Sequence, residues 1–454
     1  LYTGSLVFLY LTAAQLFSSK AACFTLAIAT AIPIFQVGFG VLSVPDNPLM
    51  FFWSASLYGA ATEFFAQPGQ YRPSYRLAMI GGLVGLACLS KYHGFVLGLG
   101  LIGFCCTSSR YRSALTSPWT ALGMSLLLVA IAPVIFWNLQ HNWVSFRFQS
   151  ARAVPAAGYH WLGLAGTFLA GVGYLFPTFG LVLWWVSCRS VLQQVFPRKF
   201  FSKFLPANVA DFRQKQQLIL WVSLPLILGF TVIGGYQQIL PTWPMPGFWG
   251  ATLLLGQQVA SWQERCERRV QYWLRGSGIA VVMILFIALL QVTAGIFQKP
   301  STHALFGGFW PVQADPSTQL VDIQQLRQGF QDSPLLNTAL QKVDFIFTNR
   351  YFLGGQIAMA LEPLAHKPLT CFDQDLRGFA FWSDADQWLN KDALYITSEL
   401  FQDGEAGWTQ YKNYFRSLRK LDEVPIRRGG AVVQIFKVYQ ADTLLKPYPR
   451  PYGV

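Results

Sequence analysis

Val44-Pro45-Asp46-Asn47-Pro48 separates two long apolar runs, residues 21–43 and 47–66, and sets a carboxylate among hydrophobic neighbours. Apolar runs of about 16 to 27 residues recur as far as residue 297. A helix needs roughly 20 apolar residues to cross a bilayer. The chain has 454 residues, of which 53% are hydrophobic and only 12% charged, and its mean hydropathy is positive. The sequence therefore predicts a polytopic α-helical membrane protein.

Ten apolar segments suggest a bundle of ten or more transmembrane helices. They are about 1–17, 21–43, 47–66, 77–90, 92–106, 118–137, 161–187, 217–234, 247–262 and 277–297. Two of them, 77–90 and 92–106, are short for full spans, so we expect them to be tilted or broken.

Basic residues are divided unequally between the two sides that these segments create. Residues 1–297 contain 18 Lys and Arg and five acidic residues, and 15 of the basic residues fall on one side. The positive-inside rule assigns that side to the cytoplasm. Asp46 then becomes the sole carboxylate of the membrane part on the outer side. The net charge of +13 therefore reflects basic loops on the cytoplasmic side of the membrane, and no nucleic-acid partner is expected.

After Gln298 the apolar runs become short, and helical and extended patterns alternate. The expected strands are 344–348, 369–372, 393–397 and 431–439, and the expected helices are 350–361 and 409–418. We therefore divide the chain into a transmembrane domain, 1–297, and an extracytoplasmic α/β domain, 298–454.

The candidate site residues are the few charged and imidazole side chains on the outer face. Charged side chains inside a membrane bundle are costly to hold, so they are functional candidates by default. A carboxylate can accept a proton from a hydroxyl nucleophile, while Lys and Arg stabilise a phosphate leaving group. The candidates are Asp46, Lys91, Arg147, Arg152, His93, His141 and His160. No zinc site is expected, because the histidines and the seven cysteines lack metal-ligand spacing.

Each charged candidate has a structural alternative. Asp46, between two prolines, could act only as the N-cap of the following helix. Lys91 could simply extend to the lipid headgroups. Arg147 and Arg152 could be interfacial anchors.

Four stretches carry a family resemblance. They are Val44-Pro-Asp-Asn-Pro-Leu-Met-Phe-Phe-Trp53 followed by Leu57-Tyr58, Leu89-Ser-Lys-Tyr-His-Gly94, Trp137-Asn-Leu-Gln-His-Asn-Trp143 with Ser145-Phe-Arg-Phe-Gln149, and Pro241-Thr-Trp-Pro-Met-Pro-Gly247. In this order they resemble the membrane glycosyltransferases of the C superfold (GT-C). The resemblance is to the bacterial family-39 or dolichyl-phosphate-mannose-protein-mannosyltransferase-like group, which is related to the lipid A aminoarabinose transferases. It covers residues 1–297.

The resemblance implies transfer of a sugar from a polyprenyl-phosphate donor to an extracytoplasmic lipid, glycan or protein acceptor, with inversion, at a bacterial inner or plasma membrane. Asp46 matches the acidic residue of the family's second conserved outer loop and is the expected catalytic residue. The expected donor-phosphate residues are Lys91, Tyr92, Arg147 and Arg152, and the expected site-lining residues are His93, Asn138, His141 and Trp243. The partners implied are the lipid-linked sugar, membrane lipids and the acceptor. A divalent cation, Mg or Mn, would suit the phosphate but is not required, because basic side chains can stabilise it.

One departure from the family concerns the start of the chain. The family's principal catalytic carboxylate lies in a first outer loop, ahead of the helices found here. Leu1 already lies in an apolar run, without a basic region or cleavage site, so we expect a truncated start and not a signal peptide.

Two alternatives from other classes remain open at this point. A transporter or flippase of a lipid-linked or anionic substrate often shows paired halves, and no such repeat is visible in the sequence. A non-catalytic membrane scaffold with an external binding domain is the other.

Overall fold

The computed structural model describes the chain except for residues 67–68, 154–157, 197–208, 321–322, 402–408 and 451–454, and except for the side chains of 151–153 and 209. The chain divides into two compact units, Leu1–Ile284 and Leu285–Val454. Each unit is described by itself. The expected domain boundary at residue 297 remains a prediction about where the membrane part ends.

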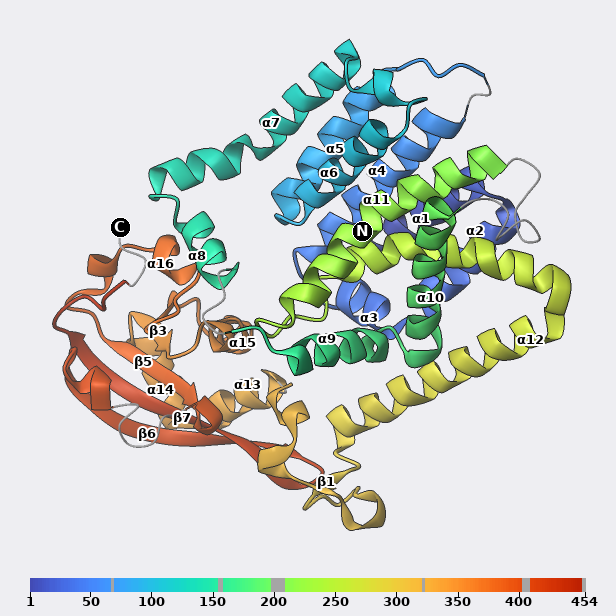
Figure 1. Ribbon diagram of the computed structural model, residues 1–454. Helices are drawn as coiled ribbons and strands as arrows, with labels where there is room; N and C mark the ends of the chain where they lie inside the picture. The colour runs from blue at the N-terminus through green and yellow to red at the C-terminus, as the bar shows by residue number, and fades with distance from the viewer. Residues whose placement is uncertain (67–68, 154–157, 197–208, 321–322, 402–408, 451–454) are drawn as a thin grey trace. The chain divides into compact units, whose positions relative to one another are not determined.

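The first unit is built from helices (Figure 1). They are α1 (Tyr2–Leu16), α2 (Ser19–Ala31), α3 (Pro33–Gln36) with a π-helical turn at Val37–Val41, α4 (Asp46–Phe65), α5 (Arg76–Ser90), α6 (Gly94–Thr107), α7 (Pro118–Gln140), α8 (Val144–Ala153), α9 (Trp161–Tyr174), α10 (Pro177–Val195), α11 (Val209–Ile233) and the first part of α12 (Met245–Ala294). Helix α1 packs on α4, α5 packs on both α4 and α7, and α6 packs on α11.

Several of these helices are apolar enough to span a membrane. Within the described ranges, α7, α11 and α12 meet the requirement by length and composition, and the number rises to as many as five if each of two bent helix pairs counts as one span. Helices α5 and α6 are short, as expected for segments 77–90 and 92–106. The fold is thus a helical majority with apolar helices, while ten or more spans remain a prediction.

The segment expected at 161–187 is not one straight helix. Helix α9 ends at Tyr174, α10 begins at Pro177, and the two are bent by 116°. Proline lacks the N–H that would continue the helix and pushes the preceding residue out of the helical region. Phe176 accordingly has an extended ψ of 125°.

The last two predicted segments of the membrane part are joined. Residues 247–262 and 277–297 belong largely to α12, which is 50 residues long and kinked at Cys266, where φ is −145° and ψ is 59° (Figure 1).

The second unit contains a five-stranded sheet in the order β4-β3-β5-β7-β6. Strands β3 (Phe345–Thr348), β4 (Leu369–Cys371) and β5 (Ala393–Ser398) are parallel, and β7 (Ala431–Leu444) runs antiparallel to both β5 and β6 (Phe415–Arg428). Helices α13 (Ile323–Asp332), α14 (Pro334–Lys342) and α15 (Tyr351–Leu361) supply apolar side chains to a core against the sheet. A second cluster of this unit is mostly aromatic: Phe345, Phe347, Phe372, Tyr395, Tyr411 and Phe415 are among its members. Short elements complete the unit, namely β1 (Gln298–Lys299), β2 (Trp310–Pro311) and α16 (Phe379–Trp382).

The four predicted strands of this unit are confirmed as β3, β4, β5 and β7, and the helix predicted at 350–361 is confirmed as α15. The helix predicted at 409–418 is wrong beyond residue 412, because Phe415 begins β6. Gly429 and Gly430 both have positive φ, which is the two-residue turn that joins twisted antiparallel strands. Pairing of β6 with β7 thus overrides the local helical pattern.

A buried ion pair fixes this hairpin to the end of α12. Arg428 Nη2 lies 2.6 Å from Asp315 Oδ2, and the two side chains are 6% and 1% exposed. Gln291 of α12 donates to the same Asp315 oxygen at 2.6 Å. Arg428 also donates to Gln298 Oε1 at 2.8 Å. Burial by itself raises the pKa of Asp315, but hydrogen bonds from Ser317 and Arg428 outweigh it and hold the pKa below the ordinary 3.8.

We predict that Arg428→Met lowers the free energy of unfolding by about 3 kcal/mol near neutral pH, because it leaves a buried carboxylate unpaired. The pKa of Asp315 is lower in the folded chain than in the unfolded chain. The ion pair therefore contributes its full stabilisation at pH values above the unfolded pKa, and this stabilisation is lost as the pH falls through the folded pKa. The wild-type chain should therefore lose this increment below about pH 4. Thermal unfolding of the full chain, followed by tryptophan fluorescence from pH 3 to 7, measures both effects. Lys420→Gln, which removes the exposed Lys420–Glu423 pair of β6, is the control and should change little.

Candidate active site at the Asp46–Lys91 pair

A buried ion pair joins the start of α4 to the end of α5. Lys91 Nζ donates to Asp46 Oδ1 at 2.7 Å and to Oδ2 at 2.9 Å. The Lys91 side chain is 19% exposed and that of Asp46 only 7%. A charged side chain that is removed from water is stable only when it is well paired, so Asp46 and Lys91 hold each other in position.

The two structural alternatives for this pair do not fit. The N-cap of α4 is Pro45, and no side-chain hydrogen bond caps this helix end. Both Asp46 oxygens instead accept from Lys91, so the interpretation of Asp46 as a cap only is wrong. Lys91 forms an ion pair with the carboxylate of Asp46, so the interpretation that it only extends to the lipid headgroups is wrong.

A tight turn between α5 and α6 positions Lys91. The N–H of Lys91 bonds the carbonyl of Ala87, and the N–H of Gly94 bonds the carbonyl of Lys91 at 2.9 Å. A Cβ on Gly94 would lie 2.4 Å from the carbonyl carbon of Ala87, so only glycine allows this approach. The sequence Lys91-Tyr92-His93-Gly94 therefore folds back at once and holds three polar side chains in one turn.

Tyr92 is held by a hydrogen-bonded chain that reaches the end of α7. Its hydroxyl lies 2.9 Å from Ser145 Oγ, and Ser145 Oγ donates to Asn138 Oδ1 at 2.6 Å. Asn138 is fully buried. Asn142 and Trp143 adopt φ values of 51° and 57°, and this left-handed turn returns the chain so that Ser145 meets Asn138. Ser145 is a supporting residue that the sequence motif contained but did not single out.

His93 lies against aromatic rings and has unused hydrogen-bonding capacity. Its ring centroid is 5.1 Å from that of Phe230 and 6.1 Å from that of Trp243. Both ring nitrogens are buried, and neither has a hydrogen-bond partner among the described residues. Buried polar atoms are normally paired, so a partner from a bound molecule would satisfy this imidazole. The structure thus brings His93 and Trp243 together beside the turn that carries Lys91.

The remaining predicted residues are placed differently. His141 contacts its own helix end, with Nδ1 2.7 Å from the Trp137 carbonyl and its ring stacked at 4.3 Å on the Trp137 indole. Arg147 is exposed on α8, and it forms no ion pair with Asp46 in the described part of the chain. The side chain of Arg152 lies outside the residues that the structure describes.

An apolar groove begins at the same turn. A cavity of about 420 Å³ lies between α5, α6 and α7, with Tyr92 and Phe146 in its wall. A second cavity of about 110 Å³ extends it along the same helices, because the two share lining residues. The shared residues are Val84, Gly98, Ile102, Met124 and Leu127. The sequence does not identify these groove residues, since helical apolar runs look alike whether they face lipid, core or groove.

The donor set at Asp46 does not fit a metal ion well. Lys91 already occupies both carboxylate oxygens. The described residues contain no group of three or more His, Cys, Asp or Glu side chains that could hold one. Hard divalent cations require several oxygen ligands, so no step is assigned to a metal.

Comparisons with known proteins agree with the motifs and the fold. Residues 1–137 match a family model described as dolichyl-phosphate-mannose-protein mannosyltransferase. The structure is similar to the crystal structure of ArnT from Cupriavidus metallidurans in the apo state, with a TM-score of 0.54 and 14% identity, over 96% of this chain and 82% of that chain. No curated protein matches the sequence. The chain thus has a fold similar to that of ArnT, and its first 137 residues match the model of the dolichyl-phosphate-mannose-protein mannosyltransferase family.

Proposed function

We propose that this chain is a GT-C glycosyltransferase that moves a sugar from a polyprenyl-phosphate donor to an extracytoplasmic acceptor, with inversion. One observation carries the proposal: Lys91, which forms a buried ion pair with Asp46, is followed directly by Tyr92 in the wall of an apolar groove between helices. A polyprenyl phosphate has an apolar tail and an anionic head. The groove and Lys91 offer a complementary surface for each part.

The donor would bind with its tail along α5, α6 and α7. The groove wall is almost entirely hydrocarbon and aromatic, which suits an isoprenoid chain. Tyr92 lines the groove and directly follows Lys91, so a tail in the groove places its phosphate near the ammonium. A phosphate that accepts from Lys91 competes with Asp46 for the same protons.

This competition gives Asp46 its role. When the donor phosphate draws Lys91 away, a carboxylate oxygen becomes available to accept a proton. The acceptor hydroxyl oxygen then bonds to the anomeric carbon, its proton passes to Asp46, and the bond from that carbon to the phosphate oxygen breaks. The electron pair stays on the polyprenyl phosphate, which Lys91 stabilises. Attack opposite the leaving group inverts the anomeric configuration.

The acceptor side is assigned to His93 and Trp243. The unpaired nitrogens of His93 would bond a sugar or acceptor hydroxyl, and the Trp243 indole offers a flat apolar face beside it. Arg147 remains a proposed phosphate ligand that would have to move toward Lys91 when the donor binds. Arg152 keeps the same proposed role, and Asn138 acts as a positioning residue through Ser145. His141 would line the site from the end of α7.

We predict that Asp46→Asn lowers sugar transfer by a factor of roughly 10² to 10⁴, because it removes the proton acceptor and leaves Lys91 without its partner. Transfer of a radiolabelled sugar from a polyprenyl-phosphate donor, in membranes that contain the full-length protein, measures this. Asp211→Asn, which alters the Asp211–Lys215 pair of α11, is the matched control and should leave transfer unchanged.

Full activity of the Asp46→Asn protein would show that the role given to Asp46 is wrong. Donor binding without transfer by the wild-type chain would instead favour the transporter or the scaffold. Repeating the assay with EDTA tests the divalent cation, and we expect no loss of activity, because Lys91 serves as the leaving-group stabiliser.

We predict that Val134→Trp raises KM about tenfold or more for a long-chain donor, because the indole fills the groove where the tail should lie. A short-chain, water-soluble donor analogue should be affected much less, since it does not need the groove. Leu128→Trp on the same helix is the control, because Leu128 is 52% exposed and does not line the groove. Equal loss with both donors would argue against a tail in this groove.

A further inference from the structure

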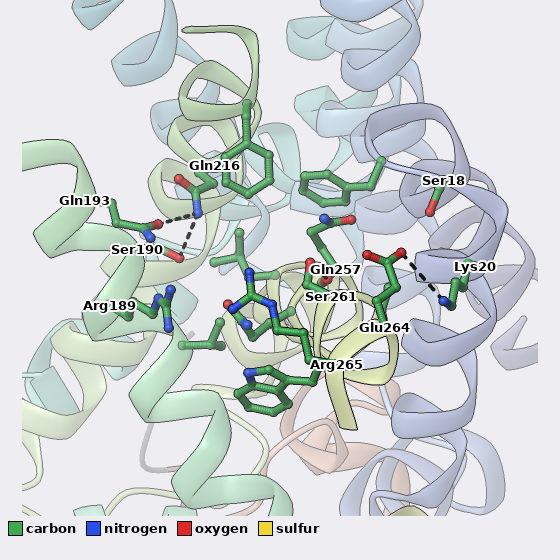
Figure 2. Close-up of a pocket in the computed structure, with 17 residues that line it drawn as sticks. Ser18, Lys20, Arg189, Ser190, Gln193, Gln216, Gln257, Ser261, Glu264 and Arg265 are labelled. Atoms are coloured by element: carbon green, nitrogen blue, oxygen red, sulfur yellow. Dashed lines mark hydrogen bonds and ion pairs between the residues drawn. The ribbon is translucent and has the colours of Figure 1, made fainter. Parts of the chain in front are cut away.

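Figure 2 shows a polar pocket within the helical unit that contains none of the candidate active-site residues. It has a volume of about 320 Å³ and is lined by the end of α1, the start of α2, and by α10, α11 and α12. Its wall contains several charged side chains and amides, in contrast to the apolar groove between α5, α6 and α7.

This pocket is at the opposite end of α4 from Asp46. Helix α4 contains 20 residues, which corresponds to a length of about 30 Å. At the far end of α4, the ring centroid of Phe65 lies 5.9 Å from Lys215 Nζ. Gln216, which follows Lys215 in the chain, lines the pocket. The pocket is therefore on the side that the basic loops assign to the cytoplasm.

Positive charge predominates in the pocket wall. Among the described residues of the wall, Lys20, Arg189 and Arg265 accompany one carboxylate, Glu264. Glu264 forms an ion pair with Lys20 at 3.7 Å, and both side chains are well exposed. Such an exposed pair is weak, so the net charge of the wall remains positive.

The two arginines extend into the pocket from different helices (Figure 2). Arg189 of α10 is held over the Trp185 ring at 5.2 Å, and this contact limits the directions it can take. Two guanidinium groups in the wall of one pocket concentrate positive charge there, which favours an anionic ligand. A phosphate group suits such a wall, since its oxygens can accept two parallel hydrogen bonds from an arginine.

Amide side chains line the pocket beside the arginines. Gln216 donates from Nε2 to Gln193 Oε1 at 2.9 Å. Its own Oε1 is buried and has no partner in the described part of the chain. An acceptor in this position suits a ligand that carries a hydroxyl or amino donor as well as an anionic group.

We propose that this pocket binds a phosphate ester, in the form of the headgroup of an anionic phospholipid. Basic pockets between transmembrane helices on the cytoplasmic side commonly bind acidic lipid headgroups. A phosphodiester with a glycerol headgroup provides both the anion for Arg189 and Arg265 and a hydroxyl for Gln216. The site does not depend on sugar transfer, because it lies about one helix length from Asp46.

Native mass spectrometry of the full chain, released from nanodiscs of mixed phosphatidylglycerol and phosphatidylcholine, tests the site. We expect the wild-type chain to retain phosphatidylglycerol selectively. Arg265→Gln should weaken that retention roughly tenfold, and the Arg189→Gln and Arg265→Gln double variant should weaken it further. Arg265→Lys should give an intermediate result, because it keeps the charge but loses the bidentate geometry.

Arg269→Gln is the matched control, since Arg269 is exposed on the same helix and does not line the pocket. Arg265 is also exposed, so its single variant should fold even if the double variant does not. Calorimetric titration with inorganic phosphate separates the two sources of the ligand. Binding that Arg265→Gln abolishes, without lipid selectivity, would assign the site to a soluble phosphate ester and overturn the lipid assignment. Equal behaviour of wild type and Arg265→Gln toward both probes would overturn the proposal altogether.

Discussion

The pairing of Asp46 with Lys91 is the constraint on which this end of the helical unit depends. Neither charge can stay at a helix end inside an apolar bundle without the other, because an unpaired buried charge is destabilising by several kcal/mol. Their contact fixes the start of α4 against the end of α5. The turn after Lys91 then determines where Tyr92 and His93 lie. One ion pair thus sets the arrangement of the polar side chains around it.

The apolar groove and this polar turn have one residue in common. Tyr92 belongs to both, since it lines the groove and is held through Ser145 by the buried amide of Asn138. A molecule with an apolar tail and an anionic head would meet hydrocarbon first and the ammonium next. The positively charged pocket around Arg189 and Arg265 is separate from this region, because it lies about one helix length from Asp46.

The second unit relies on a different buried pair. Arg428 and Asp315 connect the β6–β7 hairpin to the segment that follows α12, with Gln291 and Gln298 completing their hydrogen bonds. The sheet itself combines a parallel part, β4, β3 and β5, with this long antiparallel hairpin. The unit is therefore held by an aromatic and aliphatic core together with one fully buried charged contact.

The sequence by itself determined the membrane class, the α/β character of the C-terminal unit and the residues worth testing. Apolar runs longer than 15 residues are local signals, and they form helices in the structure. The carboxylate between two prolines is also a local signal, and it marks the start of α4. The strands β3, β4, β5 and β7 were predictable for the same reason. Only the tertiary structure decided what Asp46 contacts, because a capping role and an ion pair with a residue 45 positions away give the same local pattern. It also decided that 415–418 is strand and not helix, since the partner strand lies beyond the glycine turn. The groove and the basic pocket likewise form between helices that pack together. The spacing of residues within one segment does not predict which helix faces will contact each other.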